Sequence, residues 1–408
     1  MMLKPGDNGF DAELAGFQTA YRHRPSVVFA ARDAGDVRQA VEYAAVRDLP
    51  VAVQATGHGL SVPVEEGVLV STRRMTELAV DPRRRVARVG AGVRAGALIE
   101  AAAVHGLAPL NGSSPSVGVV GYTLGGGVGL LARRFGFAAD HVRGIEIVTA
   151  DGRLRNLDPA DELFGAVLGS GGNFGIVTAL EVDLVAVPAV FGGQLVFDAA
   201  LAGQALSAWQ RWTATVPEEV TSSLTLLPNG MASVRVASLV ADDELLAPLR
   251  AVGERVADTV RLMPYRESPS IHRDPDEPHP YRATNVLLRE LPAEALEEVR
   301  SARGAVVDIR HLGGAMSRPG PACVGHRAAR YVVRVITGPE QDHAHDTIRR
   351  ALSPWALGHL PVFLYGDVPD WPLPGYEPEL HQRLRRLKAR YDPRNMFRCN
   401  RNIVPAAG

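Results

Sequence analysis

Glycine is concentrated in one stretch of this chain. Eight glycines lie between positions 112 and 136, namely Gly112, Gly118, Gly121, Gly125, Gly126, Gly127, Gly129 and Gly136. Glycine loses more conformational freedom on folding than any other residue, so this density is unfavourable unless a ligand or another backbone fills the space that side chains would take. The stretch therefore predicts a main chain that closely approaches a partner.

Two shorter glycine motifs lie on either side of this stretch. QATGHGLS, from Gln54 to Ser61, directly follows an expected strand, and GGNFGIVT, from Gly171 to Thr178, leads into another. Rows of bare backbone N–H groups form concave anion-binding nests that suit a pyrophosphate. Together the three motifs predict a surface that binds a nucleotide through its main chain.

The common nucleotide-binding fingerprints do not fit this sequence. A dinucleotide fold carries G-x-G-x-x-G where a strand turns into a helix. GAGVRAG, from Gly90 to Gly96, has the wrong spacing and favours a plain strand-to-helix turn, and no Gly-Lys-Ser or Gly-Lys-Thr of a P-loop occurs. The sequence therefore argues against nicotinamide-nucleotide and P-loop proteins.

Strands and helices alternate up to about residue 188, which favours an α/β or α+β unit, and the pattern then changes. The first part predicts strands at 26–31, 50–55, 67–72, 77–80, 85–89, 142–149 and 176–184, with helices at 36–47 and 94–105. The second part predicts strands at 194–197, 222–227, 232–239, 305–311 and 330–337, with helices at 201–215, 242–260, 293–303 and 377–390. The polar stretch 267–281 is typical of a surface loop.

Composition excludes several classes of protein. The 408 residues carry a net charge of −1, so neither nucleic acid nor an anionic membrane is an expected partner. Cys323 and Cys399 are too few for a disulfide framework. The N-terminus shows no secretory signal, and the apolar runs are too short to span a membrane, so we expect a cytoplasmic protein. No metal site is expected, because the loop and helix histidines lack convergent spacing: His272, His279, His343 and His345.

The three glycine motifs and the C-terminal YDPRNMF-x-x-NxNI, from Tyr391 to Ile403, occur in a recognisable order. This order resembles the berberine-bridge-enzyme-like branch of the vanillyl-alcohol-oxidase flavoproteins, which have the PCMH-type FAD-binding fold. The resemblance implies a two-domain α+β protein. An FAD-binding domain is expected at 21–188 and a substrate domain at 189–384, built on an antiparallel sheet backed by helices. A C-terminal segment, 385–408, is expected to return to the first domain.

The resemblance also implies which residues contact FAD. His58 occupies the position that the family joins through a ring nitrogen to the flavin 8α-methyl group, although a histidine that only packs against the flavin is an alternative. Ser114 stands where doubly attached members carry a cysteine, so a single covalent bond at most is expected. Asp140 matches a family aspartate that is structural or contacts the ligand. The implied FAD-binding residues are Gln54, Ala55, Thr56, Gly57, His58, Gly59, Leu60, Gly112, Ser113, Ser114, Val117, Gly118, Gly121, Tyr122, Leu124, Gly125, Gly127, Val177, Asn400 and Asn402.

The catalytic base that many family oxidases use is missing. Their Tyr-x-Asn before Gly-Asp is replaced here by Pro361 and Phe363, and proline cannot accept a proton. Tyr365 would share a strand with Pro361 and face the same side, although a packed aromatic is an alternative interpretation. The candidate proton acceptors are Tyr365, Tyr122, His326 and Tyr331, and each of them has a purely structural alternative.

The leading expectation is an FAD-dependent oxidase that acts on an alcohol or amine carbon of a secondary metabolite, with hydride passing to flavin N5 and O2 as reoxidant. The missing base favours an alternative, in which a structural flavin supports a redox-neutral cyclisation. A third interpretation is a catalytically silent binding module. The expected partners are a small-molecule substrate and O2, in a monomer or homodimer.

Overall fold

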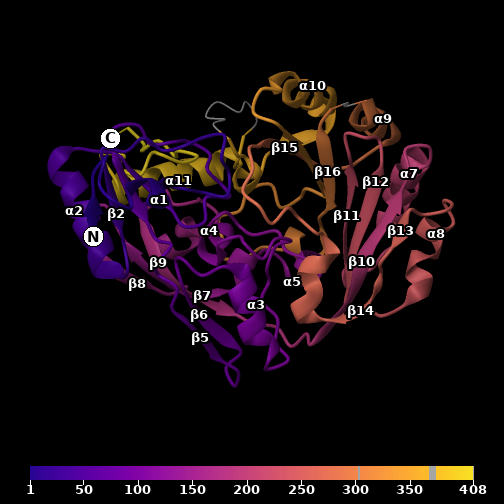
Figure 1. Cartoon of the computed structure of the whole chain (residues 1–408), viewed down its shortest axis with the longest axis horizontal. Helices are drawn as coiled ribbons and strands as arrows, with labels where there is room; N and C mark the ends of the chain where they lie inside the picture. The colour runs from indigo at the N-terminus through magenta and orange to yellow at the C-terminus, as the bar shows by residue number, and fades with distance from the viewer. Residues whose placement is uncertain (302–303, 367–373, 408) are drawn as a thin grey trace.

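The computed structural model describes residues 1–301, 304–366 and 374–407. Figure 1 shows two halves side by side, with the indigo and magenta N-terminal half on the left and the later strands on the right. The yellow C-terminal helix returns to the left half, as the resemblance implied. This two-domain α+β arrangement confirms the expected fold class, while the domain boundaries themselves stay a prediction.

The first half begins with a small sheet in the strand order β1-β2-β4-β3, in which β2, β4 and β3 run parallel. Its elements are β1 Met2–Leu3, α1 Phe10–Leu14, β2 Val27–Ala30, α2 Ala34–Arg47, β3 Val51–Gln54 and β4 Val68–Ser71. The side chain of Asp33 caps α2 by accepting a hydrogen bond from the backbone N–H of Asp36. The apolar face of α2 is buried against the sheet, and helix and strands match the sequence prediction closely.

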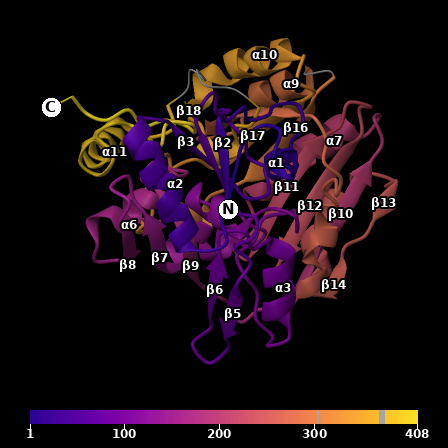
Figure 2. The same ribbon diagram turned by 60° about the vertical axis from the view of Figure 1, so that its left-hand side comes forward.

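A second, antiparallel sheet completes the first half in the order β5-β6-β9-β7-β8. Its strands are β5 Leu78–Asp81, β6 Val86–Gly90, β7 Val142–Val148, β8 Leu154–Leu157 and β9 Ile176–Asp183. The helices beside it are α3 Ala95–Ala103, α4 Val119–Leu124, α5 Ala132–Phe135 and α6 Glu162–Val167. The glycine-rich stretch therefore forms α4 and the turns around it, between the two sheets and the second half (Figure 1). Figure 2 shows the second sheet below the first one, with α3 beside β5 and β6.

The second half is built on a nine-stranded antiparallel sheet in the order β13-β10-β12-β11-β16-β17-β15-β18, with β14 also pairing with β10. Its strands are β10 Ala189–Phe197, β11 Val220–Leu226, β12 Ala232–Ser238, β13 Ala257–Asp258, β14 Arg261–Pro264, β15 Arg282–Leu288, β16 Val306–His311, β17 Tyr331–Thr337 and β18 Ala356–Gly358. Its helices are α7 Ala202–Thr213, α8 Ala247–Arg250, α9 Ala293–Ser301 and α10 Asp342–Leu352. Apolar side chains from alternate positions of the strands pack against α7, α9 and α10 on one face. The other face is turned toward the first half, because Thr221 of β11 accepts a hydrogen bond from the backbone N–H of Arg133 in α5.

The second half differs from the sequence predictions in several places. The helix expected at 242–260 is a 3₁₀ turn and the short α8, after which the chain joins the sheet edge because the Val256 N–H bonds to the Val196 carbonyl. Strand β15 was not predicted. The stretch 267–281 is not a plain surface loop, since Ser268, His272 and Tyr281 are buried. The end of the helix expected at 293–303 falls partly outside the described residues.

Helix α11, Pro378–Tyr391, carries the chain back to the first half. Its Lys388 is fully buried and donates hydrogen bonds to the Asp392 carboxylate at 2.7 Å and to the carbonyls of Asn173 and Phe397 at 2.6 and 3.0 Å. Asp392 in turn accepts from the N–H groups of Met396 and Phe397. This buried pair fixes the C-terminal segment against the GGNFG loop. Among the described residues, no helix has the length and apolarity needed to cross a membrane.

Candidate active site

The GHG motif is held in place by the N-terminal segment. Gly57 has φ +72°, and a Cβ there would lie 2.5 Å from the Cα of Gly16, so only glycine fits. The Phe17 N–H donates to the carbonyl of Thr56 at 2.9 Å. The motif therefore forms a fixed turn directly after β3, and this turn holds the next side chain, His58, in place.

His58 is oriented from three sides. Its ring stacks on Phe17 with centroids 3.8 Å apart, its Nε2 lies 2.9 Å from the hydroxyl of Ser116, and its carbonyl accepts a hydrogen bond from Tyr281 at 2.6 Å. Burial is the main reason that the pKa of His58 falls to about 4, and the charge of Arg94 lowers it further. The imidazole is therefore neutral at pH 7, the form in which a ring nitrogen keeps a lone pair.

Three glycines of the expected FAD surface face open space. Apart from the chain neighbours of each glycine and the backbone of α4 itself, no atom of the described residues lies within 4 Å of the Cβ that could be built at Gly121, Gly171 or Gly172. Gly121 lies in α4, where a bare glycine is unfavourable by about 0.5–1 kcal/mol relative to alanine. Gly118 lies across from the GHG motif, because its N–H reaches the hydroxyl of Thr56 at 3.3 Å. The three glycine motifs thus come together around one uncovered stretch of main chain.

Other glycines of the same stretch are needed for packing within the protein. A Cβ at Gly125 would lie 2.6 Å from Val362, and one at Gly127 would lie 2.7 Å from Ala138. The side chain of Tyr122 fills the space beside Gly112 and Gly127. The sequence could not separate these glycines from the open ones, because both kinds share one motif.

The remaining residues expected at FAD have varied surroundings. The Gln54 amide donates to the carbonyls of Leu14 and Ala15, and Ser113 donates to Asp274 at 2.5 Å. Most of the other positions make contacts inside the protein. The backbone carbonyls of Val117, Leu124 and Leu60 accept hydrogen bonds from the N–H groups of Ala95, of Gly169 and Gly171, and of Gly366, respectively. The hydroxyl of Ser114 contacts that of Ser116, the Asn400 amide donates to the carbonyls of Gly172 and Phe397, Ala55 lies near Gly118, and Val177 is buried in β9. Asn402, in contrast, is exposed. Most of these residues line the junction of the three motifs, and their contact with FAD stays a prediction.

Three of the candidate proton acceptors are engaged elsewhere. Tyr122 donates to the carbonyl of Leu110 at 3.1 Å. Tyr331 lies on the helix-covered face of the large sheet, and its hydroxyl is 2.7 Å from Thr213. His326 contacts the segment before α11 through its Nε2, 3.1 Å from the carbonyl of Pro374. These contacts favour a structural role for each of the three residues.

Tyr365 is placed differently. Its ring lies 3.8 Å from the Cβ position of Gly59, and it packs edge-on against Tyr281 with ring centroids 6.0 Å apart. The expected strand shared with Pro361 is wrong, because Pro361–Phe363 is a 3₁₀ turn and Tyr365 instead pairs through its backbone with Ala283 of β15. Proline fits the first position of such a turn because its φ is already fixed. Tyr365 therefore stands between the GHG motif and the large sheet.

Asp140, matched to the family aspartate, has a structural role here. Both of its carboxylate oxygens accept hydrogen bonds from the Arg327 guanidinium, at 2.7 and 2.9 Å. Both side chains are mostly buried, and the bidentate geometry is the strong form of this pair. The pair ties the first half to the segment that precedes β17.

The comparisons with known proteins agree with this geometry. A family model for an FAD binding domain matches residues 25–158, and one described as berberine and berberine like matches residues 363–404. The (R)-6-hydroxynicotine oxidase of Paenarthrobacter nicotinovorans is 28% identical over 99% of this chain and 96% of that protein. The chain therefore combines an FAD binding domain with a berberine-like C-terminal segment, and it is similar over 98% of its length to an FAD-linked oxidoreductase of Bacillus subtilis, at 25% identity.

Solved structures of other oxidases share the whole fold. The 6-hydroxy-D-nicotine oxidase of Arthrobacter nicotinovorans gives a TM-score of 0.85 at 27% identity and covers 100% of this chain and 98% of its own. A chitooligosaccharide oxidase gives 0.88 at 20% identity, covering 100% and 97%, which bears on the fold alone. The match to an FAD binding domain and the similarity to FAD-linked oxidoreductases identify FAD as the cofactor. The uncovered main chain at Gly121, Gly171 and Gly172 fits FAD, because it leaves room for a ligand where protein atoms do not reach.

Several residues of the site were not found from the sequence. Phe17, Ser116 and Tyr281 surround His58 but lie far apart along the chain. Charged residues alternate with apolar ones in β16 and β17, as in VVDIRH and YVVRVIT, a pattern that could have indicated a polar sheet face.

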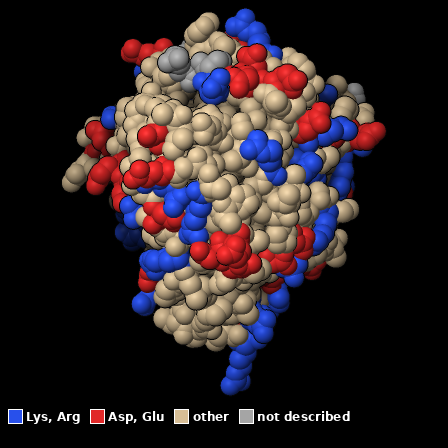
Figure 3. Space-filling view, turned by 90° about the vertical axis from the view of Figure 1, so that its right-hand side faces the viewer, with Lys and Arg blue, Asp and Glu red and all other residues tan. Residues whose placement is uncertain are grey.

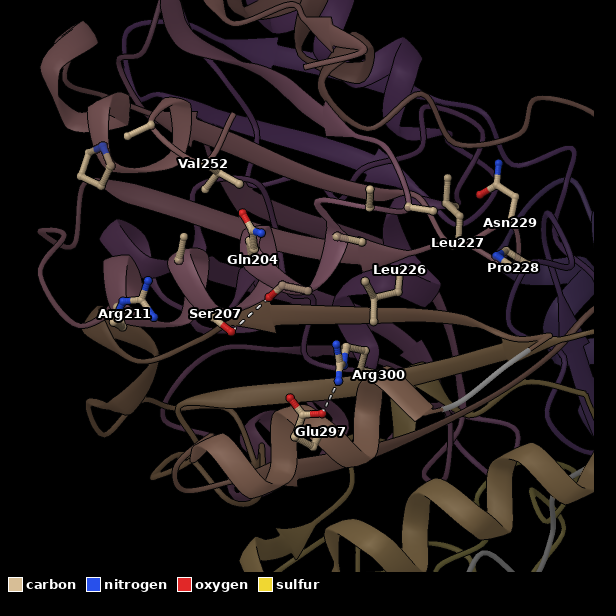
Figure 4. Close-up of a pocket in the computed structure, with 18 of the residues that line it drawn as sticks. Gln204, Ser207, Arg211, Leu226, Leu227, Pro228, Asn229, Val252, Glu297 and Arg300 are labelled. Carbon is tan, nitrogen blue, oxygen red and sulfur yellow. Dashed lines mark hydrogen bonds and ion pairs between the residues drawn. The ribbon is translucent and has the colours of Figure 1, made fainter. Parts of the chain in front are cut away.

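A large outer hollow lies away from this site. Figure 4 shows it between α7, α9 and the turn from β11 to β12, with Glu297 and Arg300 paired on one wall. Arg211 lies at its edge. Its lining comes from the second half alone, so it is not the place where the three glycine motifs meet.

Proposed function

We propose that this berberine-bridge-enzyme-like protein is an oxidase that acts on an alcohol or amine carbon of a small secondary metabolite. When bound, FAD supplies the hydride acceptor at N5, and O2 takes the electron pair with two protons to give hydrogen peroxide. The position of Tyr365 carries the proposal, because its ring lies beside Gly59 and next to the substrate-domain sheet. The similarity to the (R)-6-hydroxynicotine oxidase of Paenarthrobacter nicotinovorans supports oxidation of this general kind.

Tyr365 is the proposed acceptor of the substrate hydroxyl or amine proton. Burial raises the pKa of Tyr365, and the nearby charges of Arg334 and Arg310 oppose that rise. The phenol of Tyr365 is therefore protonated at neutral pH. Because only the phenolate accepts a proton, the population of the active base rises with pH. We expect the rate of substrate oxidation to increase into the alkaline range, and Tyr365→Phe to remove that increase.

His58 is proposed to hold FAD through one covalent bond. The neutral imidazole keeps a lone pair that could bond to the 8α carbon of FAD, and the stack on Phe17 and the contact with Ser116 would fix its ring. A C–H bond of that methyl group would break with loss of the proton, and the electron pair would pass to the flavin and then to O2. Ser114 has no sulfur, so a second bond at that position is excluded chemically. His58→Ala should leave the flavin in solution after acid precipitation, whereas the unaltered chain should carry its colour into the pellet.

A redox-neutral cyclisation remains the second candidate function, because Pro361 removes the tyrosine that family oxidases use. Anaerobic mixing with a panel of alcohols and amines separates the two candidates. Bleaching of the flavin by a compound, followed by recovery of the colour in air with peroxide release, supports the oxidase. Conversion of a compound while the flavin stays oxidised would contradict the oxidase and support the cyclase.

A further inference from the structure

The face of the large sheet that is turned toward the first half is polar. Alternate positions on β10, β12, β11 and β16 place Gln194, Arg235, Ser223 and Arg310 in one row across the sheet. The next row places Ser233, Thr225, Asp308, Arg334 and Asn285 on β12, β11, β16, β17 and β15. A sheet face enclosed between two halves is usually apolar, so a polar one indicates a ligand. We call Arg235, Arg310 and Arg334 the arginine triad.

Nearby carboxylates neutralise only part of the positive charge of the arginine triad. The Asp308 carboxylate accepts from Arg310 and Arg334, each at 3.0 Å, while a terminal nitrogen of Arg235 bonds to the hydroxyl of Thr225. Asp274, from the 267–281 stretch, interacts electrostatically with Arg310 and Arg235. Burial lowers the pKa of the neighbouring His272, which favours the neutral ring at pH 7. Three arginines against two carboxylates leave one positive charge.

Several hydrogen-bond donors of this cluster are unmet. Within the described residues, the hydroxyl of Ser223 and the Nε groups of Arg235 and Arg334 are buried and have no hydrogen-bond partner. Ser223 is only 3% exposed and stands between Arg235 and Arg310 in its row. Buried donors without partners are rare and unfavourable, so the cluster is incomplete as a purely structural network.

The triad lies beside the proposed reaction site. Arg334 and Arg310 face the ring of Phe363, with their guanidinium carbons 4.4 and 5.3 Å from its centroid. Both arginines interact electrostatically with Tyr365. Their side chains remain 11% and 12% exposed, so part of each guanidinium can be reached. A substrate group that binds to these arginines would place the rest of the substrate within reach of Tyr365.

We propose that the substrate carries a carboxylate, which binds to the arginine triad. Guanidinium groups recognise carboxylates through paired, charge-assisted hydrogen bonds. The single unbalanced positive charge matches a monoanion better than the dianion of a phosphate ester. The inference rests on the proposed function, since it assigns the substrate class of the same site. The outer face of this half offers no comparable charge, because acidic and basic side chains are interspersed there (Figure 3).

Binding of matched compounds to the FAD-loaded protein tests the proposal. The probes are benzoate, 1-naphthoate and 4-hydroxyphenylacetate, each compared by calorimetry with its neutral primary amide and, for benzoate, with phenyl phosphate. We expect each acid to bind at least about tenfold more tightly than its amide, as for a charge-assisted contact, and benzoate to bind more tightly than phenyl phosphate. Equal binding of acids and amides, or no binding by any acid, would overturn the proposal; tighter binding of phenyl phosphate would replace the carboxylate with a phosphate.

Arg235→Gln is the variant of choice, because Arg235 makes no hydrogen bond to Asp308 and its loss leaves that carboxylate paired with Arg310 and Arg334. The preference for acids should fall about tenfold, and Arg235→Lys should restore part of it. Arg211→Gln, at the exposed outer hollow, is the matched control and should leave the preference unchanged. An unchanged preference in Arg235→Gln, with its thermal unfolding intact, contradicts the proposal.

The proposed function can fail separately from this inference. Acids that bind through Arg235 but never bleach the flavin would refute the oxidase and keep the carboxylate site. Neutral alcohols or amines that bleach the flavin, without any preference for acids, would keep the oxidase and refute the carboxylate site.

Discussion

The imidazole of His58 lies flat on the phenyl ring of Phe17, with ring centroids 3.8 Å apart and an angle of 13° between the planes. The contact joins the N-terminal segment to the GHG motif, where Gly16 and Gly57 touch main chain to main chain. The N-terminal segment therefore sets the orientation of the residue that is proposed to carry FAD.

Removing the ring of Phe17 should reduce covalent attachment of FAD. Phe17→Ala frees the imidazole of His58 to rotate and costs about 1 kcal/mol of stacking in addition to lost burial. We expect a smaller fraction of flavin in the acid-precipitated pellet, measured from its visible absorbance. Phe17→Tyr keeps the stack and is the control; an equal bound fraction in Phe17→Ala would contradict the orienting role.

A single methyl group at Gly121 should separate FAD binding from folding. Gly121 lies in α4 with open space around its Cβ position, so alanine should stabilise the FAD-free protein by about 0.5–1 kcal/mol. The same methyl group should block FAD, with loss of flavin absorbance in the purified protein. Gly338→Ala also meets no atoms within the described residues, and should leave the colour unchanged. Full flavin content in Gly121→Ala would show that FAD does not approach α4 there.

Lys388 should hold the C-terminal segment in place. Lys388→Met leaves the buried Asp392 carboxylate without its cation, which typically costs about 3–5 kcal/mol. We expect a lower unfolding midpoint in urea and faster proteolysis after α11. Lys4→Met alters the other lysine of the chain, which is exposed, and should change neither measurement. Unaltered stability in Lys388→Met would contradict the anchoring role.

Stability should fall as the solution becomes acidic, in part through His23. Its Nδ1 accepts a hydrogen bond from the Val64 N–H at 2.9 Å, and burial lowers its pKa from 6.5 to about 4. The folded state therefore binds this proton less readily, so its contribution is complete above pH 6.5 and is lost as pH falls toward 4, by ~3 kcal/mol. His23→Asn keeps an acceptor but does not titrate, and urea unfolding should show a shallower loss between these pH values. An identical pH dependence in the variant would refute this assignment.

Local patterns predicted much of the first half. The helix at 36–47 follows from its Asp cap and from the spacing of Val37, Ala40, Val41 and Ala44, and the structure begins it at Ala34. The strands beside it are buried apolar runs bounded by turns, and they lie where the sequence placed them.

Contacts between distant residues could not be predicted in the same way. The 267–281 stretch is polar like a surface loop, yet Tyr281 reaches the His58 carbonyl and Asp274 reaches Ser113. Strand β15 was missed because RATNVLL has both polar and apolar residues inside the protein, where Asn285 contacts the Leu360 carbonyl. Tertiary pairing, and not local periodicity, decides the structure of such segments.

The visible absorption spectrum of the purified protein tests the central claim most directly, namely that the uncovered main chain of the three glycine motifs holds FAD. We expect the flavin bands in the blue region, present on purification or restored by added FAD. A protein that remains colourless after incubation with FAD, while its unfolding curve shows it to be folded, would contradict this account.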